Sequence, residues 1–124
     1  MLSNITMYAA LPVKNMQEAM HFYGEVLGLT IIDENENGVW YQTGQSRIAV
    51  YESKFAGTNQ ATAVIFEVTE PLSMSKTLAS KGIVFEKYDL PGVKRRGVIH
   101  TMGNFKAAWF KDPSGNIIAM GTHL

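Results

Sequence analysis

Few side chains in this sequence could perform acid–base chemistry. Glu67 is the one carboxylate inside an otherwise apolar segment, residues 62–68. Burial there would favour its protonated form and make it a weak candidate general base. A structural ion pair with Arg47, or simple exposure at a rim, is the alternative role for Glu67.

The sequence contains no recognisable metal or nucleophile motif. It has no cysteine, which excludes disulfides, thiolate metal sites and a cysteine nucleophile. The three histidines, His21, His100 and His123, lack the short spacing of a ligand motif, so we expect surface or capping roles for them. His100 is the exception, because strand alternation does not determine on which face of the sheet its side chain lies. Glycine-rich phosphate loops are also absent.

Charge and hydropathy exclude several classes of partner. Eleven Lys and Arg balance eleven Asp and Glu, so no global field favours nucleic acid or an anionic membrane. The loop that contains the basic run Lys94-Arg95-Arg96 could fold over a cup as a lid and recognise an anionic ligand. The ordinary alternative is that this run lies in a solvated loop. No apolar run reaches the ~18 residues of a membrane span, and no signal peptide begins the chain. A cytoplasmic location is therefore expected.

The elements that must position these residues follow one order in the first half of the chain. A strand over residues 5–13 precedes a helix that begins after Asn15, with Glu18 at capping-box spacing, and ends at Gly28. Apolar residues recur along this helix at helical spacing. Three strands are then predicted, over residues 29–33, 39–43 and 47–52.

The second half repeats this order after a polar linker, residues 53–60. A strand over 62–68 leads into a helix over 69–81, with Pro71 in its first turn and Gly82 after its end. A short strand over 83–86 and a long loop over 87–97 are predicted next. Three strands complete the chain, over residues 98–102, 105–111 and 116–121.

The two halves can be overlaid by their sequence spacing. The span from Tyr8 to Val13 matches residues 63–68 at an offset of 55, and residues 47–51 match residues 117–121 at an offset of 70. The difference of 15 residues fits an insertion in the 87–97 loop. We therefore predict one α+β domain of 124 residues, built from two βαβββ units over 1–52 and 61–124.

Two stretches carry a family resemblance. The strand and helix "YAALPVKNMQEAMHFYGEVLGL" and the hairpin "AAWFKDPSGNIIAM" resemble the glyoxalase / bleomycin-resistance / extradiol-dioxygenase superfamily, the vicinal oxygen chelate proteins. The resemblance implies an open, curved, eight-stranded barrel-like sheet around a cup, with two helices outside and a homodimeric assembly. In the hairpin, Asp112 can accept from downstream N–H groups and Gly115 can take a left-handed conformation, which pairs Asp112 with Asn116 and Trp109 with Ala119.

The positions at which such relatives bind a metal lack donors in this chain. Carried over, the opening-strand positions fall on Tyr8 and Ala63, and the closing-strand positions on Ala49 and Ala119. A divalent ion needs nitrogen or oxygen donors at about 2.0–2.6 Å, which alanine does not have and neutral tyrosine supplies poorly. A shift of one residue does not restore a donor. We expect no metal and no cofactor.

The resemblance and period-two alternation together predict an apolar and aromatic cup with few charges. Such a lining suits an unidentified small organic molecule with one or two polar handles. Residues such as Trp109 and Tyr51 are more often core filling than ligand contacts, and Tyr8 could fill the volume of a missing metal site or donate a phenolic hydrogen bond. The predicted cup residues are Tyr8, Arg47, Ala49, Tyr51, Ala63, Ile65, Glu67, Trp109 and Ala119.

Three functions remain open. The leading hypothesis is a metal-independent small-molecule-binding protein of the glyoxalase / bleomycin-resistance type. The first alternative is a lyase, isomerase or dioxygenase of the same superfamily that uses non-standard ligands or an acid–base residue such as Glu67, Tyr8 or His100. The second alternative is an interaction module whose cup is filled by its own side chains.

Overall fold

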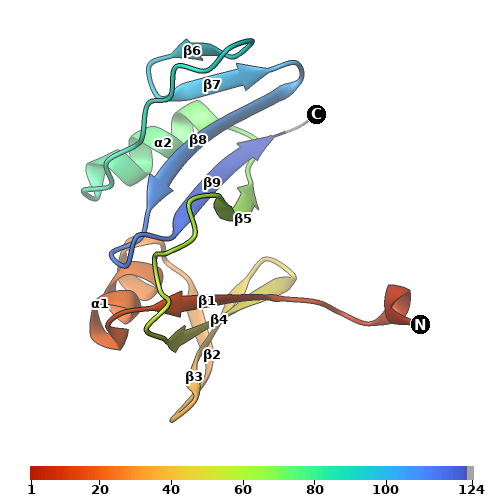
Figure 1. Cartoon of the computed structure of the whole chain (residues 1–124), viewed down its shortest axis with the longest axis vertical. Coiled ribbons are helices and arrows are strands. Elements are labelled where there is room, and N and C mark those ends of the chain that lie inside the picture. Colours follow the sequence, from red (N-terminus) through yellow and green to blue (C-terminus); the bar gives the residue numbers. More distant parts are fainter. Residues whose placement is uncertain (123–124) are drawn as a thin grey trace.

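The computed structural model describes residues 1–122 of the chain and shows two β-sheets with their helices (Figure 1). The first sheet has the strand order β1-β4-β3-β2, and the second has the order β5-β9-β8-β7-β6. In each sheet the first strand pairs in parallel with the last strand of its unit, β1 with β4 and β5 with β9. The strands are β1 Ala9–Val13, β2 Thr30–Asn35, β3 Gly38–Thr43, β4 Ser46–Glu52, β5 Thr62–Glu67, β6 Lys94–Arg96, β7 Ile99–Met102, β8 Phe105–Lys111 and β9 Ile117–Thr122.

One helix belongs to each unit, as predicted. The helix α1, Met16–Met20, continues without a break into the π-helical segment η2, His21–Val26. Asn15 caps it by accepting a hydrogen bond from the Glu18 N–H at 2.9 Å. The helix α2, Pro71–Ser80, begins at its proline, where the missing N–H costs nothing. A short 3₁₀ helix, η1 Leu2–Asn4, precedes β1.

The α+β class, with one helix in each unit, is confirmed, while four details differ from the prediction. The strands form two separate open sheets, with a ninth strand, instead of one eight-stranded sheet. The extra strand, β6, lies inside the predicted 87–97 loop and pairs with β7. The strand predicted over 83–86 is wrong, because Phe85 makes only an isolated bridge to Phe110. The first strand begins at Ala9, four residues later than predicted.

Both sheets contribute one face to a single hydrophobic core. Leu11, Val13 and Val50 point into it from the first sheet, and Phe110 and Ile118 from the second. Because side chains alternate along a strand, the residues between these buried ones lie on the opposite face of each sheet. We call these two faces, which turn away from the shared core, the outer faces.

The turn between β8 and β9 joins the two units through one buried carboxylate. Asp112 Oδ1 accepts from the N–H groups of Ser114 at 2.9 Å and Asn116 at 2.8 Å. Its Oδ2 accepts from the Tyr23 hydroxyl of η2 at 2.6 Å and from Asn116 Nδ2 at 2.8 Å. Figure 1 shows this turn reaching α1 and η2. The predicted pairing of Asp112 with Asn116 is confirmed, and Gly115 has the expected positive φ of 94°.

Two further hydrogen bonds extend the junction to the end of β1. Asn116 Nδ2 also donates to the Pro12 carbonyl at 2.7 Å, and the Lys14 N–H donates to Ser114 Oγ at 2.8 Å. Buried polar groups that keep all these partners stabilise the fold and define one arrangement of the two units. The DPSGN turn is therefore an inter-unit clamp as well as a hairpin.

The Tyr23 phenol predicts a specific dependence of stability on pH. Burial and the neighbouring Asp112 carboxylate raise the pKa of Tyr23 far above its ordinary value. Above about pH 10 the unfolded chain releases this proton and the folded chain retains it, so the free energy of unfolding falls by about 1.4 kcal/mol per pH unit. Tyr23→Phe should cost about 1–2 kcal/mol at pH 7 and should make the decline above pH 10 shallower. Urea unfolding between pH 7 and 11 measures both effects, and an unchanged slope would contradict this role.

Candidate functional site

The predicted cup residues of the first unit lie on the outer face of the first sheet. Along β4, Ile48 and Val50 are buried in the core, while Arg47, Ala49 and Tyr51 alternate with them on the other side. Tyr51 is 37% exposed, and Tyr8, just before β1, is 44% exposed. This face is therefore open in the single chain.

The predicted residues of the second unit lie on the outer face of the second sheet. Trp109 pairs with Ala119, as predicted, and Ile65 pairs with Ala119 from the other side. Ile65 is 59% exposed, whereas Ala119 is 1% exposed. Since both outer faces turn away from one shared core, the nine predicted residues do not converge on a single closed cup within one chain.

The two closing-strand alanines pair with residues that lie two positions after the predicted opening-strand sites. Ala10 pairs with Ala49, and Ile65 pairs with Ala119, while Tyr8 and Ala63 lie two residues before these partners. Tyr8 instead lies next to Arg47, whose guanidinium is 5.4 Å from the centre of the Tyr8 ring. The side chains of Ala10 and Ile65 have no metal-donor atom either.

The indole of Trp109 lies across Ala119. Its Nε1–H donates to Thr62 Oγ1 at 3.1 Å, although Trp109 is on β8 and Thr62 is two strands away on β5. Neighbouring strands are about 4.8 Å apart, so an indole that reaches β5 must cross β9. Ala119 is the β9 residue that pairs with Trp109, which explains why its methyl group is buried. The side chain at position 119 is small because a ring lies over it.

His100 is a structural residue of this face. It is fully buried, and its Nε2 accepts the Tyr88 N–H at 2.9 Å, so the proton is on Nδ1, which donates to the Val98 carbonyl at 3.0 Å. Its ring also meets Trp109 edge-on, with 5.0 Å between centroids. Both nitrogens are thus engaged in the fold. His21 is an exposed surface residue paired with Glu25, as expected, and His123 lies outside the described residues.

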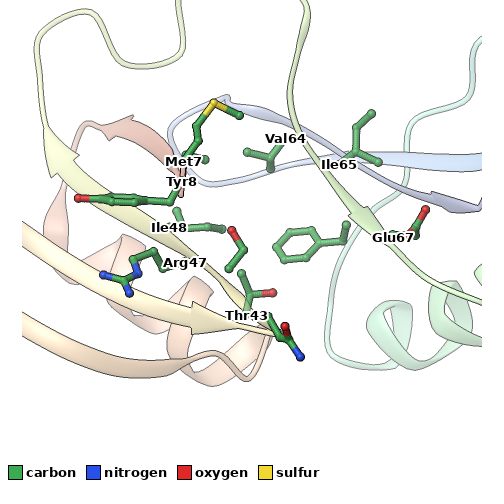
Figure 2. Close-up of a pocket in the computed structure, with 13 residues that line it drawn as sticks. Met7, Tyr8, Thr43, Arg47, Ile48, Val64, Ile65 and Glu67 are labelled. Atoms are coloured by element: carbon green, nitrogen blue, oxygen red, sulfur yellow. The ribbon is translucent and has the colours of Figure 1, made fainter. Parts of the chain in front are cut away.

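A pocket of about 890 Å³ lies at the seam between the two units. It is lined by the start of β1, the turn between β3 and β4, and the edge strand β5. Four predicted cup residues belong to it: Tyr8, Arg47, Ile65 and Glu67. Figure 2 shows Tyr8 and Arg47 side by side on one flank, with Ile65 and Glu67 on the opposite flank. The seam thus combines aromatic, aliphatic and charged groups around one hollow.

Glu67 is exposed on β5, whereas the general-base hypothesis placed it in a buried segment. Arg47 and Glu67 lie on opposite flanks of the pocket, with Arg47 against Tyr8 (Figure 2). Glu67 is therefore an exposed residue that lines the rim of the pocket.

The side chains at the family's metal positions do not fit a metal ion. Ala49, Ala63 and Ala119 have no donor, and Trp109 occupies the space in front of Ala119. Within residues 1–122, no three His, Cys, Asp or Glu side chains come together as a metal group would require. No step of a reaction is therefore derived through a metal at these positions.

Sequence reasoning missed the aromatic residue that corresponds to Trp109 in the first sheet. Trp40, on β3, pairs with Ala49 of β4, as Trp109 of β8 pairs with Ala119 of β9. The two tryptophans of the chain thus occupy the same place in the two sheets, and both are half-buried. The signal for Trp40 was the two-residue turn at 44–45, which pairs Trp40 with Ala49 as the Pro-Ser-Gly turn pairs Trp109 with Ala119.

The basic run is held in the strand β6, which pairs with β7. Arg95 Nε donates to Asp89 Oδ1 at 3.1 Å, and its Nη1 donates to the Gly97 carbonyl at 2.8 Å. Lys94 and Arg96 are exposed on either side of it. The central guanidinium of the run is therefore committed to its own loop.

Comparison with known proteins identifies the fold. The model of the Glyoxalase/Bleomycin resistance protein/Dioxygenase superfamily matches residues 5–120. The chain belongs to this superfamily. Its structure is similar to a glyoxalase family protein from Enterococcus faecalis, with 19% identity, a TM-score of 0.75, and coverage of 98% of this chain and 99% of that one.

Other solved structures extend the likeness. A lactoylglutathione lyase from Agrobacterium tumefaciens has 16% identity and a TM-score of 0.71 over 96% of this chain and 93% of its own. A bleomycin-binding protein, solved with bleomycin, has 15% identity and a TM-score of 0.71 over 94% and 97%. Identities this low support the fold alone. No protein of curated function matches the chain, and no described helix is long and apolar enough to cross a membrane.

The contrast between the two closing-strand alanines gives a test of the Trp109 geometry. Ala119→Leu should destabilise the protein by about 1–3 kcal/mol, because the added atoms must displace the indole above them. Ala49→Leu, at the matching but half-buried position, should cost less than about 0.5 kcal/mol. Urea unfolding of both variants measures the difference. Equal costs would show that the indole does not occupy this space in solution.

Proposed function

We propose that this superfamily member is a metal-independent protein that binds a small organic molecule. The observation that carries the proposal is the replacement of donors by methyl groups at the metal positions, with the Trp109 indole over one of them. Recognition would then rest on shape, on aromatic surface and on a few polar groups. The seam pocket supplies such a combination, with Tyr8 and Arg47 on one flank and Ile65 and Glu67 on the other.

We also propose that the chain is one domain formed by an internal repeat and acts in the cytoplasm. The single core shared by both sheets supports one domain, with units over 1–52 and 61–124. The two sheets have corresponding strand orders, apart from the additional edge strand β6 of the second, and this correspondence supports the repeat. The absence of cysteine is compatible with a reducing compartment, in which disulfides do not form.

Two measurements on purified protein test the binding proposal. Elemental analysis should find Zn, Ni, Mn and Fe well below one equivalent per chain, and a stoichiometric metal would overturn the metal-independent proposal. Thermal melting against a panel of metabolites and drugs should find stabilising ligands. A ligand at 100 times its Kd adds about 2.7 kcal/mol, which corresponds to roughly 10 °C for a domain of this size. No stabilisation by any compound of a broad panel would count against binding.

The open outer faces favour a second copy of the chain as partner. They expose the large hydrophobic side chains Ile65, Tyr8 and Tyr51 to water, and contact with a second copy would bury this apolar surface. The N-terminal arm extends away from both sheets (Figure 1), and Leu2 and Met7 on it are 79% and 87% exposed.

The charges of the two halves are complementary. Residues 1–60 contain three Lys and Arg against six Asp and Glu, whereas residues 61–124 contain eight against five. The first half of one copy would therefore attract the second half of another. A homodimer arranged in this way would supply the walls that the outer faces lack.

Sedimentation equilibrium tests the dimer. The wild-type protein should sediment as a dimer, and Ile65→Glu, which places a charge on the open outer face, should shift it toward monomer by at least tenfold in Kd. Val84→Glu is the matched control, because Val84 is 83% exposed but lies outside both sheets. A wild-type monomer at 100 µM, or equal effects of the two variants, would contradict the proposal.

A further inference from the structure

The outer face of the second sheet carries two aromatic rings above small residues. Trp109 crosses β9 over Ala119. Phe105, four residues earlier on the same strand and face, lies over Gly121 in the same way, because a Cβ added to Gly121 would be 3.0 Å from the Phe105 ring. The small side chains of β9 thus give room for two rings that lie low on the sheet.

The orientation of the Trp109 ring is fixed before any ligand arrives. Its Nε1–H is bound to Thr62 Oγ1. The rings of His100 and Tyr88 meet it edge-on at centroid distances of 5.0 and 5.8 Å. The indole crosses β9 over Ala119, and the Trp109 residue is only half-buried, so part of its surface is exposed. A rigid aromatic ring with exposed surface suits stacking recognition, since little side-chain entropy is lost on binding.

The neighbourhood favours an aromatic ligand over a saccharide. Ala107, Ala119 and Ile65 lie beside Trp109 on this face and have no polar side-chain atom. The Thr62 hydroxyl is already engaged by the indole, both nitrogens of His100 are used within the fold, and Lys111 on the same face pairs with Glu86. Apart from the Tyr88 hydroxyl, a sugar placed here would meet few free hydrogen-bond partners, whereas a planar ring needs none.

We propose that this platform, Trp109 with Phe105, binds a planar aromatic ring system by stacking. The inference rests on the proposed binding function and narrows its ligand class to compounds with a flat aromatic body. Ile65 belongs both to this face and to the seam pocket, so a ligand on the platform adjoins the pocket that contains Arg47. Polar substituents of the ligand would lie toward that side.

A pair of probes that differ only in aromaticity tests the inference. 2-Naphthoate and decahydro-2-naphthoate have the same carbon skeleton and charge, but only the first is flat and aromatic. Two-dimensional NMR resolves the two indole N–H signals of the chain, and Trp40→Phe assigns them. 2-Naphthoate should shift the Trp109 signal saturably and bind at least about fivefold more tightly than its saturated analogue, as expected for stacking.

Variants separate stacking from structural effects. Trp109→Leu should weaken 2-naphthoate at least about tenfold and abolish its advantage over the saturated analogue. Thr62→Val keeps the ring but removes its hydrogen bond, and should weaken 2-naphthoate by roughly two- to fivefold. Phe55→Leu, in the exposed linker, is the matched control and should change nothing. If Trp109→Leu does not fold, Phe105→Leu, expected to weaken 2-naphthoate at least about threefold, takes its place.

The outcomes distinguish this inference from the proposed function. Equal binding of the two probes, or a shift of the Trp40 signal alone, would overturn stacking on Trp109 even if other compounds stabilise the protein. A melting panel without any stabilising compound would instead overturn the binding function itself. Tighter binding of maltose than of 2-naphthoate at the Trp109 signal would also overturn the aromatic ligand class.

Discussion

The Asp112 carboxylate is the contact on which the arrangement of the two units depends. Four donors converge on its two oxygens, from the turn itself, from Asn116 and from the Tyr23 hydroxyl of the other unit. A buried carboxylate is costly unless its lone pairs are satisfied, so the turn is stable only when it is seated against η2. The same residue therefore closes the hairpin and fixes the angle between the sheets.

This junction decides where ligands can reach the protein. Seating the turn on η2 brings the core faces of both sheets together, and it follows that both outer faces must turn outward. The residues that the family resemblance placed around one cup are thus divided between two faces and a seam. A closed cup on these faces needs residues from a second molecule. Ligand binding and association with a partner are therefore coupled in the proposed function.

Local patterns in the sequence were sufficient for the parts of the fold that depend on neighbouring residues. Alternation assigned Arg47, Ala49 and Tyr51 to one face, and the Pro-Ser-Gly turn fixed the pairing of Trp109 with Ala119. The partition into two sheets depends on contacts between Asp112 and Tyr23, 89 residues apart, which no local pattern reveals. Likewise, the apolar residues 83–86 suggest a strand. Phe85 is buried because its ring packs against Phe110 in the core, and its backbone forms only an isolated bridge instead of a strand ladder.

A metal-donor side chain at position 119 and the Trp109 indole would compete for the same space. A histidine or glutamate there would need the volume that the Trp109 indole occupies, and the indole needs a small residue beneath it to reach Thr62. The two arrangements exclude each other sterically, so the side chain at position 119 and the place of the indole are coupled. Under the proposed function, this face offers a ring held by its neighbours in place of a coordinating side chain, and recognition there would depend on stacking.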